Sequence, residues 1–309
     1  MAHYLITGGC GFIGSHLADR LIDDGHRVTI LDDLSTGRLE NKPAAARLVV
    51  GDVADPDAVS QAMEGVDGVF HLAAVASVQR SRELWAETHR TNLSGTVTVF
   101  EAARSARNGH PVPVVYASSA AVYGNNPDTP LAEGSATVPL SAYGVDKLGC
   151  ELHARVAWNI HGVPTVGFRF FNVYGPRQDP SSPYSGVISI FSRKVARGED
   201  VDIHGDGQQV RDFVFVGDVV RFLAAAMERE PKGATVYNLC TGRPTSLLML
   251  LDVLQELCNG KIRRNHLPPR LGDIRVSIGN PARLREVFGM SCQIGLLQGL
   301  SATLTGRMP

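Results

Sequence analysis

Short apolar runs alternate with amphipathic segments through the first 170 residues of the chain. Between the runs, apolar side chains return at helical spacing, as at Ile13, Leu17 and Leu21. Short apolar strands separated by helices are typical of βαβ units around a parallel sheet. The pattern therefore predicts an α/β fold with a doubly wound parallel sheet. Its expected strands are Tyr4–Ile6, Val28–Leu31, Leu48–Val50, Val69–Ala73, Val112–Ala117 and Thr165–Phe170.

The pattern changes after Phe171. Residues 172–212 are rich in Gly, Pro and Ser. A helix-like stretch (Val219–Met227), a strand-like run (Val236–Leu239) and a second helix-like stretch (Leu247–Leu257) follow. We therefore expect two domains: residues 1–171 with the sheet, and residues 172–309 as a smaller α/β domain with segments that cross back to the sheet.

Composition narrows the class of protein. The 309 residues carry a net charge of −1, so there is no basic excess for nucleic acid. The five cysteines are scattered and form no CxxC, which favours reduced cytosolic thiols over disulfides or a zinc site. No apolar stretch reaches the roughly 18 residues of a membrane helix. We expect a cytoplasmic protein with no metal, nucleic-acid or membrane partner.

A glycine-rich loop follows the first predicted strand. TGGCGFIGSH (7–16) places Gly8, Gly11 and Gly14 as G-x-x-G-x-x-G before a helix. Glycine permits positive φ and lets the backbone approach a pyrophosphate, and free N–H groups at a helix start attract that anion. Asp32 ends the second strand, where a carboxylate suits the ribose of NAD and repels the 2′-phosphate of NADP. The loop therefore predicts NAD binding, although Arg38 nearby leaves NADP open.

Two polar residues near the sheet each have two interpretations. Asp52 follows the third strand and could cap the helix Pro56–Met63 or contact the adenine of the cofactor, or both. His71 is expected to be a packed, hydrogen-bonded residue beside the cofactor rather than a catalyst.

The best candidate for catalysis follows the fifth strand. Tyr143 and Lys147 are four residues apart, so they share one face of a helix, and Ser118 and Ser119 end the strand before it. Oxidising a secondary alcohol with NAD requires removal of the hydroxyl proton as well as a hydride. A lysine ammonium and the positive nicotinamide ring favour the phenolate that can take this proton. Ser119 can hydrogen-bond the same substrate oxygen.

Taken together, these motifs resemble those of the extended short-chain dehydrogenases/reductases, in the NAD-dependent epimerase/dehydratase group. Within the group the chain is most similar to nucleotide-sugar 4-epimerases of the UDP-glucose 4-epimerase type. The resemblance implies a Rossmann fold and covers nearly the whole chain. It rests on TGGCGFIGSHL, LDDLSTG, HLAA, TNLSGT, SSAAVYG, YGVDK, RFFNVYGPRQDP, HGDGQQVRDFVFVGDV and PRLGDIR.

The resemblance also implies site residues. For NAD they are Gly8, Gly11, Phe12, Ile13, Asp32, Asp52, Val53, Leu72, Ala73, Ala74, Asn92, Tyr143 and Lys147. For the UDP-sugar they are Ser119, Asn172, Val201, His204, Arg211, Arg270, Asp273 and Ser277. Arginine suits a diphosphate because its planar fork pairs with phosphate oxygens. Three alternatives stay open: the arginines could be surface or domain-bridging residues, Asn172 could be a turn residue, and His204 stands where phenylalanine is more usual.

The reaction expected from the resemblance is reversible C4 epimerisation of a UDP-hexose through a 4-keto sugar, with tightly bound NAD. Ser119, Tyr143 and Lys147 are the expected catalytic residues. Ala120 and Ala121 replace the Asp–Glu pair of sugar 4,6-dehydratases, which disfavours elimination. Ser277 leaves room for an acetamido group, so UDP-GlcNAc and UDP-GalNAc are expected beside UDP-glucose and UDP-galactose. The alternatives are a UDP-glucuronate 4-epimerase or decarboxylase, a 4-reductase, and a non-catalytic NAD-binding sensor.

The resemblance finally implies a partner. Helices expected near Glu87–Ala106 and Ala142–Asn159 carry apolar residues on more than one face. In the family such helices pair as a four-helix bundle, so a homodimer is expected.

Overall fold

The computed structural model describes residues 1–179, 186–258, 262–270 and 272–309. Residues 180–185 of the Gly-, Pro- and Ser-rich segment, and Leu271 of PRLGDIR, lie outside the described residues. The chain divides into two compact units, both discontinuous in sequence. The first comprises residues 1–122, 141–169 and 220–237, and the second comprises residues 123–140, 170–219 and 238–309.

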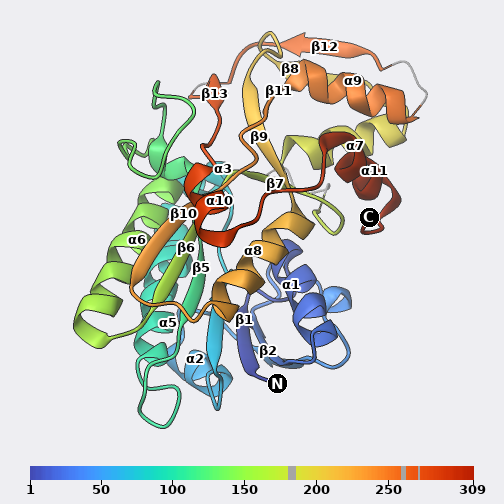
Figure 1. The fold of residues 1–309 in the computed structure, drawn as a ribbon. Helices are drawn as coiled ribbons and strands as arrows, with labels where there is room; N and C mark the ends of the chain where they lie inside the picture. The colour runs from blue at the N-terminus through green and yellow to red at the C-terminus, as the bar shows by residue number, and fades with distance from the viewer. Residues whose placement is uncertain (180–185, 259–261, 271) are drawn as a thin grey trace. The chain divides into compact units, whose positions relative to one another are not determined.

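The first unit is built on a seven-stranded sheet (Figure 1). Its order is β3-β2-β1-β4-β5-β6-β10, and the strand pairs from β3 to β5 are parallel. This confirms the predicted doubly wound parallel sheet. The strand order reverses at β1, between β4 and β2, and ligands of such sheets bind at that switch point. The strands are β1 (His3–Thr7), β2 (Arg27–Asp32), β3 (Arg47–Val50), β4 (Gly68–His71), β5 (Val114–Ser119), β6 (Thr165–Phe170) and β10 (Ala234–Leu239).

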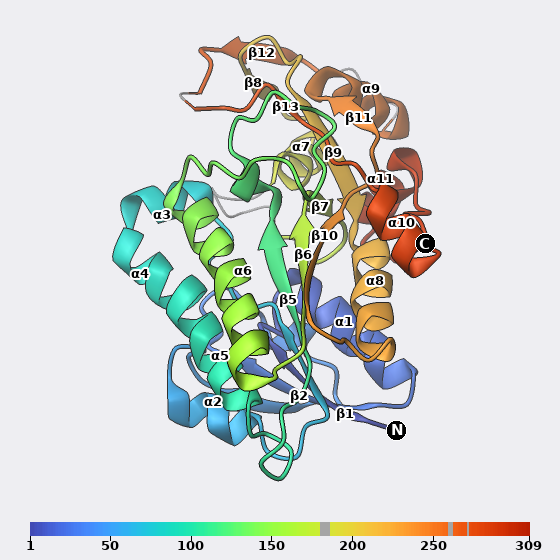
Figure 2. The same cartoon turned by 60° about the vertical axis from the view of Figure 1, so that its left-hand side comes forward.

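Helices cover both faces of this sheet (Figure 2). On one face lie α2 (Pro56–Ala62), α5 (Gly95–Ala103) and α6 (Ala142–His161), and on the other lie α1 (Phe12–Asp23) and α8 (Val216–Glu228). Two further short helices are α3 (Val78–Glu83) and α4 (Trp85–His89). Sheets buried on both faces need continuous apolar strands, which explains why the runs in the sequence do not alternate with polar residues.

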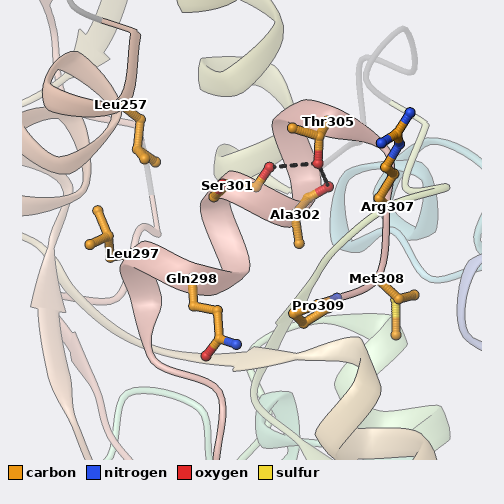
Figure 3. Close-up of a pocket in the computed structure, with 9 residues that line it drawn as sticks. All are labelled: Leu257, Leu297, Gln298, Ser301, Ala302, Thr305, Arg307, Met308 and Pro309. Carbon is orange, nitrogen blue, oxygen red and sulfur yellow. Dashed lines mark hydrogen bonds between the residues drawn. The ribbon is translucent and has the colours of Figure 1, made fainter.

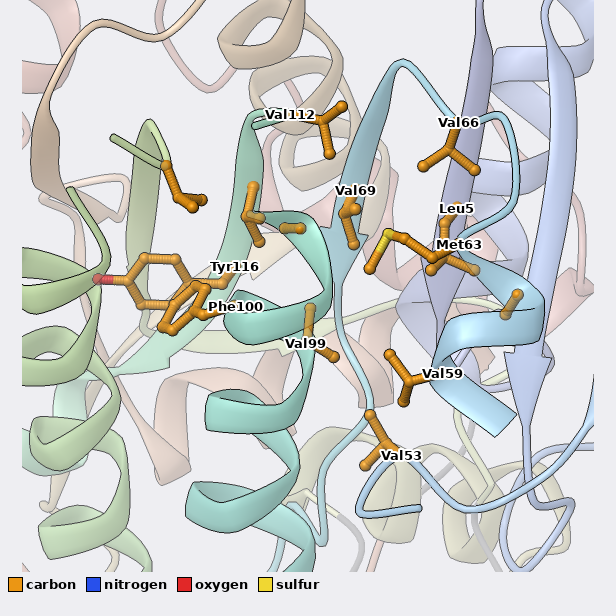
Figure 4. Close-up of a cluster of buried hydrophobic side chains, with 14 of the residues drawn as sticks. Leu5, Val53, Val59, Met63, Val66, Val69, Val99, Phe100, Val112 and Tyr116 are labelled. Atoms are coloured by element: carbon orange, nitrogen blue, oxygen red, sulfur yellow. The ribbon is translucent and has the colours of Figure 1, made fainter. Parts of the chain in front are cut away.

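The main core lies between the sheet and the helices of one face (Figure 4). Leu5 and Val69 from the strands pack with Val59 of α2 and Val99 of α5, and all four are fully buried. Tyr116 of β5 meets Phe100 of α5 edge to face. Burying an aliphatic or aromatic side chain of this kind contributes about 1.5–3 kcal/mol. The core therefore holds β1, β4 and β5 in place, and the predicted site residues follow the carboxyl ends of these strands.

The long helix predicted near 87–106 differs in detail from the structure. A π-helical turn (Arg90–Ser94) joins α4 to α5, and α5 ends at Ala103. Asn92 lies within this turn, fully buried, and its side chain bonds both the N–H and the carbonyl of Val75. A π-helical turn is wider than an α-helical one. Here it contains Asn92, whose hydrogen bonds to Val75 hold the chain after β4.

The second unit carries a sheet in the order β11-β9-β13, with β7 also paired to β9, and a separate β12-β8 pair. On α9, Leu247, Leu250, Leu251 and Leu254 are buried at helical spacing. The elements are β7 (Asn172–Tyr174), α7 (Val187–Ala196), β8 (Val201–His204), β9 (Val210–Phe215), β11 (Pro244–Ser246), α9 (Leu247–Cys258), β12 (Arg264–Leu267), β13 (Val276–Ser277), α10 (Ala282–Phe288) and α11 (Leu296–Thr305).

None of the helices within the described ranges has the length and apolar character that a membrane crossing requires.

Candidate active site

The glycine loop joins β1 to α1 at the switch point of the sheet. Gly8 has φ +71°, and a Cβ there would lie 2.8 Å from the backbone of Ala73. A Cβ on Gly14 would lie 2.2 Å from the carbonyl oxygen of Gly8. Helix α1 begins at Phe12, and its N-cap, Gly11, supplies no side-chain cap. The loop therefore holds its backbone close to the helix start, with the free N–H groups of Phe12 and Ile13 in the first turn, as a phosphate cradle requires.

Asp32 ends β2 beside this loop. Its carboxylate accepts the N–H of Cys10 at 2.9 Å and the N–H of Leu34 at 2.9 Å. Burial raises the pKa of Asp32, and the two backbone hydrogen bonds oppose that rise. The carboxylate is thus held at the carboxyl end of the strand following the glycine loop, the position expected for a contact with a ribose.

Asp52 does not cap the helix that follows it. Asp55 is the N-cap of α2: its side chain accepts the N–H of Asp57, and Pro56 is the first helical residue. Asp52 instead accepts the N–H of Ala54 and forms an ion pair with Arg90. The capping interpretation of Asp52 is therefore wrong, because a proline-led helix takes its cap from the residue before the proline. Contact with the adenine stays a prediction.

The segment after β4 is fixed by hydrogen bonds from β1. Thr7 Oγ1 accepts the N–H groups of Leu72 and Ala73, each at 3.2 Å. Ala74 follows in the same loop, which the Asn92 side chain holds through a hydrogen bond from the N–H of Val75. Val53 is buried, and its side chain packs against Gly95 of α5.

The three predicted catalytic residues lie at the carboxyl end of β5 and the start of α6. Ser119 ends β5, and its Oγ accepts the N–H of Ala121 at 3.1 Å. Helix α6 is capped by Ser141, so Tyr143 lies in its first turn and Lys147 one turn later. Lys147 is 2% exposed, its Nζ donates to the carbonyl of Ala117 at 2.9 Å and lies 6.0 Å from the centre of the Tyr143 ring. A buried ammonium thus lies beside the tyrosine. It is bonded to Ala117, which is two residues before Ser119 on β5.

Three of the predicted substrate residues meet in the second unit. Arg211 on β9 donates to Asp273 at 2.5 Å, and Ser277 on β13 is the register partner of Arg211. The Arg211 side chain is only 16% exposed, and burial lowers its pKa against the opposing effect of Asp273. Asn172 is the first residue of β7, paired to Phe213 of β9, so the turn interpretation of Asn172 is wrong.

The remaining substrate residues lie around the β8–β12 pair. Val201 is buried, and Nδ1 of His204 donates to the carbonyl of Pro268 at 3.2 Å, because a carbonyl oxygen can only accept. Gln209 donates to the His204 carbonyl at 2.8 Å and to Asp273 at 3.3 Å, which connects this pair of strands to the Arg211 cluster. Arg270 is exposed, and its backbone carbonyl accepts the N–H of Asp273.

Comparison with known proteins decides the family. The model of the NAD dependent epimerase/dehydratase family matches residues 4–240. This chain belongs to that family.

Members of the epimerase/dehydratase family resemble this chain over nearly its whole length. A UDP-glucose 4-epimerase of Mycolicibacterium smegmatis is 38% identical over 97% of this chain and 96% of its own. The structure of a Thermotoga maritima UDP-glucose 4-epimerase with UDP-glucose superposes with a TM-score of 0.93 at 36% identity, covering 98% of both chains. A UDP-N-acetylglucosamine 4-epimerase of Methanobrevibacter ruminantium, in complex with UDP-N-acetylmuramic acid, gives 0.93 at 33% identity over 99% and 97%.

His71 of this epimerase/dehydratase family member is packed, as expected. Its Nδ1 lies 2.8 Å from Thr7 Oγ1 and its Nε2 lies 2.9 Å from Thr96 Oγ1. Thr96 donates its own hydroxyl proton to the carbonyl of Asn92, so Nε2 is the donor and Nδ1 the acceptor of a neutral ring. Burial, with a smaller contribution from Lys147, lowers the pKa of His71 to about 3.

This buried imidazole predicts a loss of stability in acid. In the unfolded chain His71 has a pKa of about 6.5, so it binds a proton below that pH, whereas in the folded chain it stays neutral until about pH 3. The free energy of unfolding therefore falls as the pH falls from about 6.5 to about 3. Between pH 6 and 5 the free energy of unfolding should fall about 1 kcal/mol more in the natural protein than in His71→Gln. Urea titrations at both pH values measure this difference. Equal pH slopes in the two proteins would show that the fold does not lower the pKa of His71.

A separate pocket of about 420 Å³ lies on α11 of the second unit (Figure 3). It contains none of the predicted site residues, so the proposed chemistry does not use it. Its lining comprises Leu257, Leu297, Gln298, Ser301, Ala302, Thr305, Arg307, Met308 and Pro309.

Sequence reasoning missed two groups of residues beside the catalytic ones. The first is the two threonines that bond His71. A packed, hydrogen-bonded His71 was expected, but Thr7 and Thr96 lie 64 and 25 residues from it, so no spacing in the sequence reveals them. The second is Glu151, which bonds Ser118 and Arg169. A signal for Glu151 was present, since it lies four residues beyond Lys147 on the same predicted helix.

Proposed function

We propose that this protein catalyses reversible epimerisation at C4 of a UDP-hexose, through a 4-keto sugar and with bound NAD. The observation that carries the proposal is the buried Lys147 ammonium beside Tyr143, at the strand end that carries Ser119. Membership of the epimerase/dehydratase family supports it, as do the relatives that are named UDP-sugar 4-epimerases. A sensor that only binds NAD has no need of this arrangement.

The first unit would hold the cofactor. The glycine loop fits a dinucleotide, because only hydrogen is tolerated at the Cα atoms of Gly8 and Gly14 and the helix start that follows has no side-chain cap. Asp32 would bind the adenosine ribose, and the backbone at Asp52, Val53 and Leu72–Ala74 would line the rest of the site. Asn92 would support the last of these segments through its two hydrogen bonds to Val75. When bound, NAD accepts the hydride of C4 and returns it.

The residues of α6 and β5 would move the proton. Tyr143 takes the proton of the C4 hydroxyl as the hydride leaves and returns it when the alcohol forms again. The buried ammonium of Lys147 would attract the negative charge that develops on the Tyr143 oxygen during the transfer. Ser119 donates a hydrogen bond to the same substrate oxygen, which positions it for Tyr143.

The second unit would hold UDP while the sugar turns over. Arg211 and Arg270 would bind the diphosphate, with Arg211 leaving or sharing its contact with Asp273. Asn172, Val201 and His204 would contact the nucleotide. A diphosphate suits Arg211 because its largely buried guanidinium gains a partner of higher charge than the single carboxylate of Asp273.

Ser277 would set the tolerance for the sugar's C2 substituent. Its side chain is small, and the register of β13 places it beside Arg211. We therefore propose that UDP-GlcNAc and UDP-GalNAc are substrates beside UDP-glucose and UDP-galactose. Ser277→Tyr should lower kcat/KM for the acetylated sugars about 10-fold or more relative to UDP-galactose, the size of effect that a steric clash in a binding pocket produces. Ser277→Ala is the matched control and should leave the ratio unchanged; an unchanged ratio in Ser277→Tyr as well would exclude this role.

A second copy of the chain would pair with α6. This helix exposes Val145, Leu152, Val156 and Ile160 along one stripe, with exposed fractions of 48–71%. Four exposed aliphatic side chains at helical spacing are typical of a helix–helix interface. We propose a homodimer, which sedimentation velocity tests; a monomer at every concentration would exclude it.

Product analysis tests the proposed function. The purified protein is incubated separately with UDP-galactose, UDP-GalNAc and UDP-glucuronate, without added NAD, and the sugars formed are identified. C4 epimers of the first two are expected. Release of CO₂ or turnover of UDP-glucuronate alone would instead assign a decarboxylase or a UDP-glucuronate 4-epimerase, and net NADH accumulation would indicate a reductase. No turnover even with NAD supplied would contradict an epimerase acting on these sugars.

A further inference from the structure

A buried ion pair fastens the catalytic helix to the sheet. Glu151 of α6 and Arg169 of β6 have side chains only 1% and 5% exposed. Arg169 Nε donates to Glu151 Oε1 at 2.8 Å, and Nη2 donates to Oε2 at 2.7 Å. Both carboxylate oxygens are therefore held by the planar fork of one guanidinium, which fixes their direction as well as their distance.

The same carboxylate also reaches β5. Ser118 Oγ donates to Glu151 Oε1 at 2.6 Å, and one helical turn earlier Lys147 Nζ donates to the carbonyl of Ala117. Tyr143, Lys147 and Glu151 are spaced by four residues, so they share one face of α6. Along that face the helix is joined to the last residues of β5 before Ser119, and through Arg169 to β6.

This pair is a costly way to stabilise a fold. Removing two charges from water costs free energy, and the attraction between the charges often does no more than offset that cost. Apolar side chains of similar volume often give the fold the same stability. The pair adds directional hydrogen bonds to β5 and β6, which restrict the position of α6 along the strands more than apolar contacts do. A tyrosine base and a serine donor need such a position, because small displacements of reacting groups are costly to rate.

We propose that Glu151 and Arg169 are positioning residues for catalysis, which hold α6 in the register that places Tyr143 and Lys147 relative to Ser119. Neither residue is assigned a contact with the sugar or the cofactor. The proposal rests on the proposed epimerase function, since it describes how the same catalytic residues are held.

The test replaces both charges at once. In Glu151→Met/Arg169→Met the space is filled by apolar side chains, so no charge is left buried alone. We expect an unfolding midpoint within a few degrees of the natural protein, kcat lowered about 10-fold or more, and KM for the UDP-sugar within about 2-fold, because geometry rather than binding is lost. A folded double variant with the natural kcat would overturn the proposal.

A control separates positioning from general loss of stability. Val59→Ala removes volume from the same core at α2, away from α6, and should lower the unfolding midpoint without lowering kcat. If kcat falls equally in Val59→Ala, the effect of the double variant is only structural and the proposal is wrong.

A milder variant covers failure of the double variant to fold. Arg169→Lys keeps the charge but offers one donor group in place of the fork, so it should fold and lose roughly 3- to 10-fold in kcat at unchanged KM. A folded Arg169→Lys with the natural kcat would contradict positioning by the pair.

Failure of the proposed function is recognised separately. If the natural protein binds NAD but turns over no UDP-sugar, the epimerase proposal fails and the pair is tested by cofactor affinity instead. Lys147 is a proposed NAD contact, so the double variant should then bind NAD about 5-fold or more weakly, while Val59→Ala should not. Unchanged NAD affinity in the folded double variant would overturn the positioning role.

Discussion

Tyr143→Phe is expected to lower kcat for C4 epimerisation about 10³-fold, within the range that a general base contributes, while the protein stays folded and retains NAD. The change removes one oxygen atom. Helix α6 does not depend on that oxygen, because its first turn is capped by the Ser141 side chain, which accepts the N–H of Gly144. The loss should therefore appear in kcat, with KM for the UDP-sugar little changed.

The matched control for this variant is Tyr4→Phe. Tyr4 is also in the first unit, on β1, but it packs against Phe70 of β4 and against His26 just before β2, and it has no proposed role in the reaction. Removing its hydroxyl should leave kcat unchanged. Initial rates and bound NAD are measured for both variants. A kcat for Tyr143→Phe within about 3-fold of the natural value would mean that another group takes the proton.

Gly14→Ala is expected to weaken NAD binding by about 10- to 100-fold, the consequence of roughly 1–3 kcal/mol of overpacking in the loop that holds the pyrophosphate. The added Cβ would lie 2.2 Å from the carbonyl oxygen of Gly8 and 2.8 Å from the Cα of Gly9, so the loop and the start of α1 must move apart. Because both partners are backbone atoms, no side-chain rotation relieves the contact.

Gly134→Ala serves as the control for this substitution, since a Cβ at Gly134 meets no atom within 4 Å. NAD released from each denatured protein is quantified, and the unfolding midpoint is measured with and without added NAD. The midpoint of Gly14→Ala should respond to NAD less than that of the control. Natural NAD content in Gly14→Ala would contradict the assignment of this loop to the pyrophosphate.

The first unit was largely predictable because its strands are buried on both faces and so read as apolar runs. All six runs expected before residue 171 are strands of one sheet, and the run near Val236 joins it as β10. The π-helical turn at Asn92 was not predictable, because it depends on a hydrogen bond to Val75 on another segment. The strands β11 and β13 have three and two residues, too few to show a period.

The candidate site was predictable where its chemistry is local. Tyr143 and Lys147 lie on one helix, and the glycine loop is one turn, so spacing together with position after a predicted strand indicated each. The contact of Arg211 with Asp273 spans 62 residues and depends on the pairing of β9 with β13, which no spacing encodes. The capping interpretation of Asp52, one of two left open, was wrong for a local reason: Asp52 and Asp55 are both acceptable caps, and Pro56 selects Asp55.

The most direct measurement of the central claim uses UDP-galactose labelled with deuterium at C4, incubated with the purified protein without added NAD. If bound NAD takes the labelled hydride and returns it to the same carbon, the UDP-glucose formed keeps its deuterium at C4, although the reaction runs in ordinary water. Loss of the label to solvent, or inversion at another carbon, would contradict a hydride exchange at C4 and with it the role proposed for Tyr143.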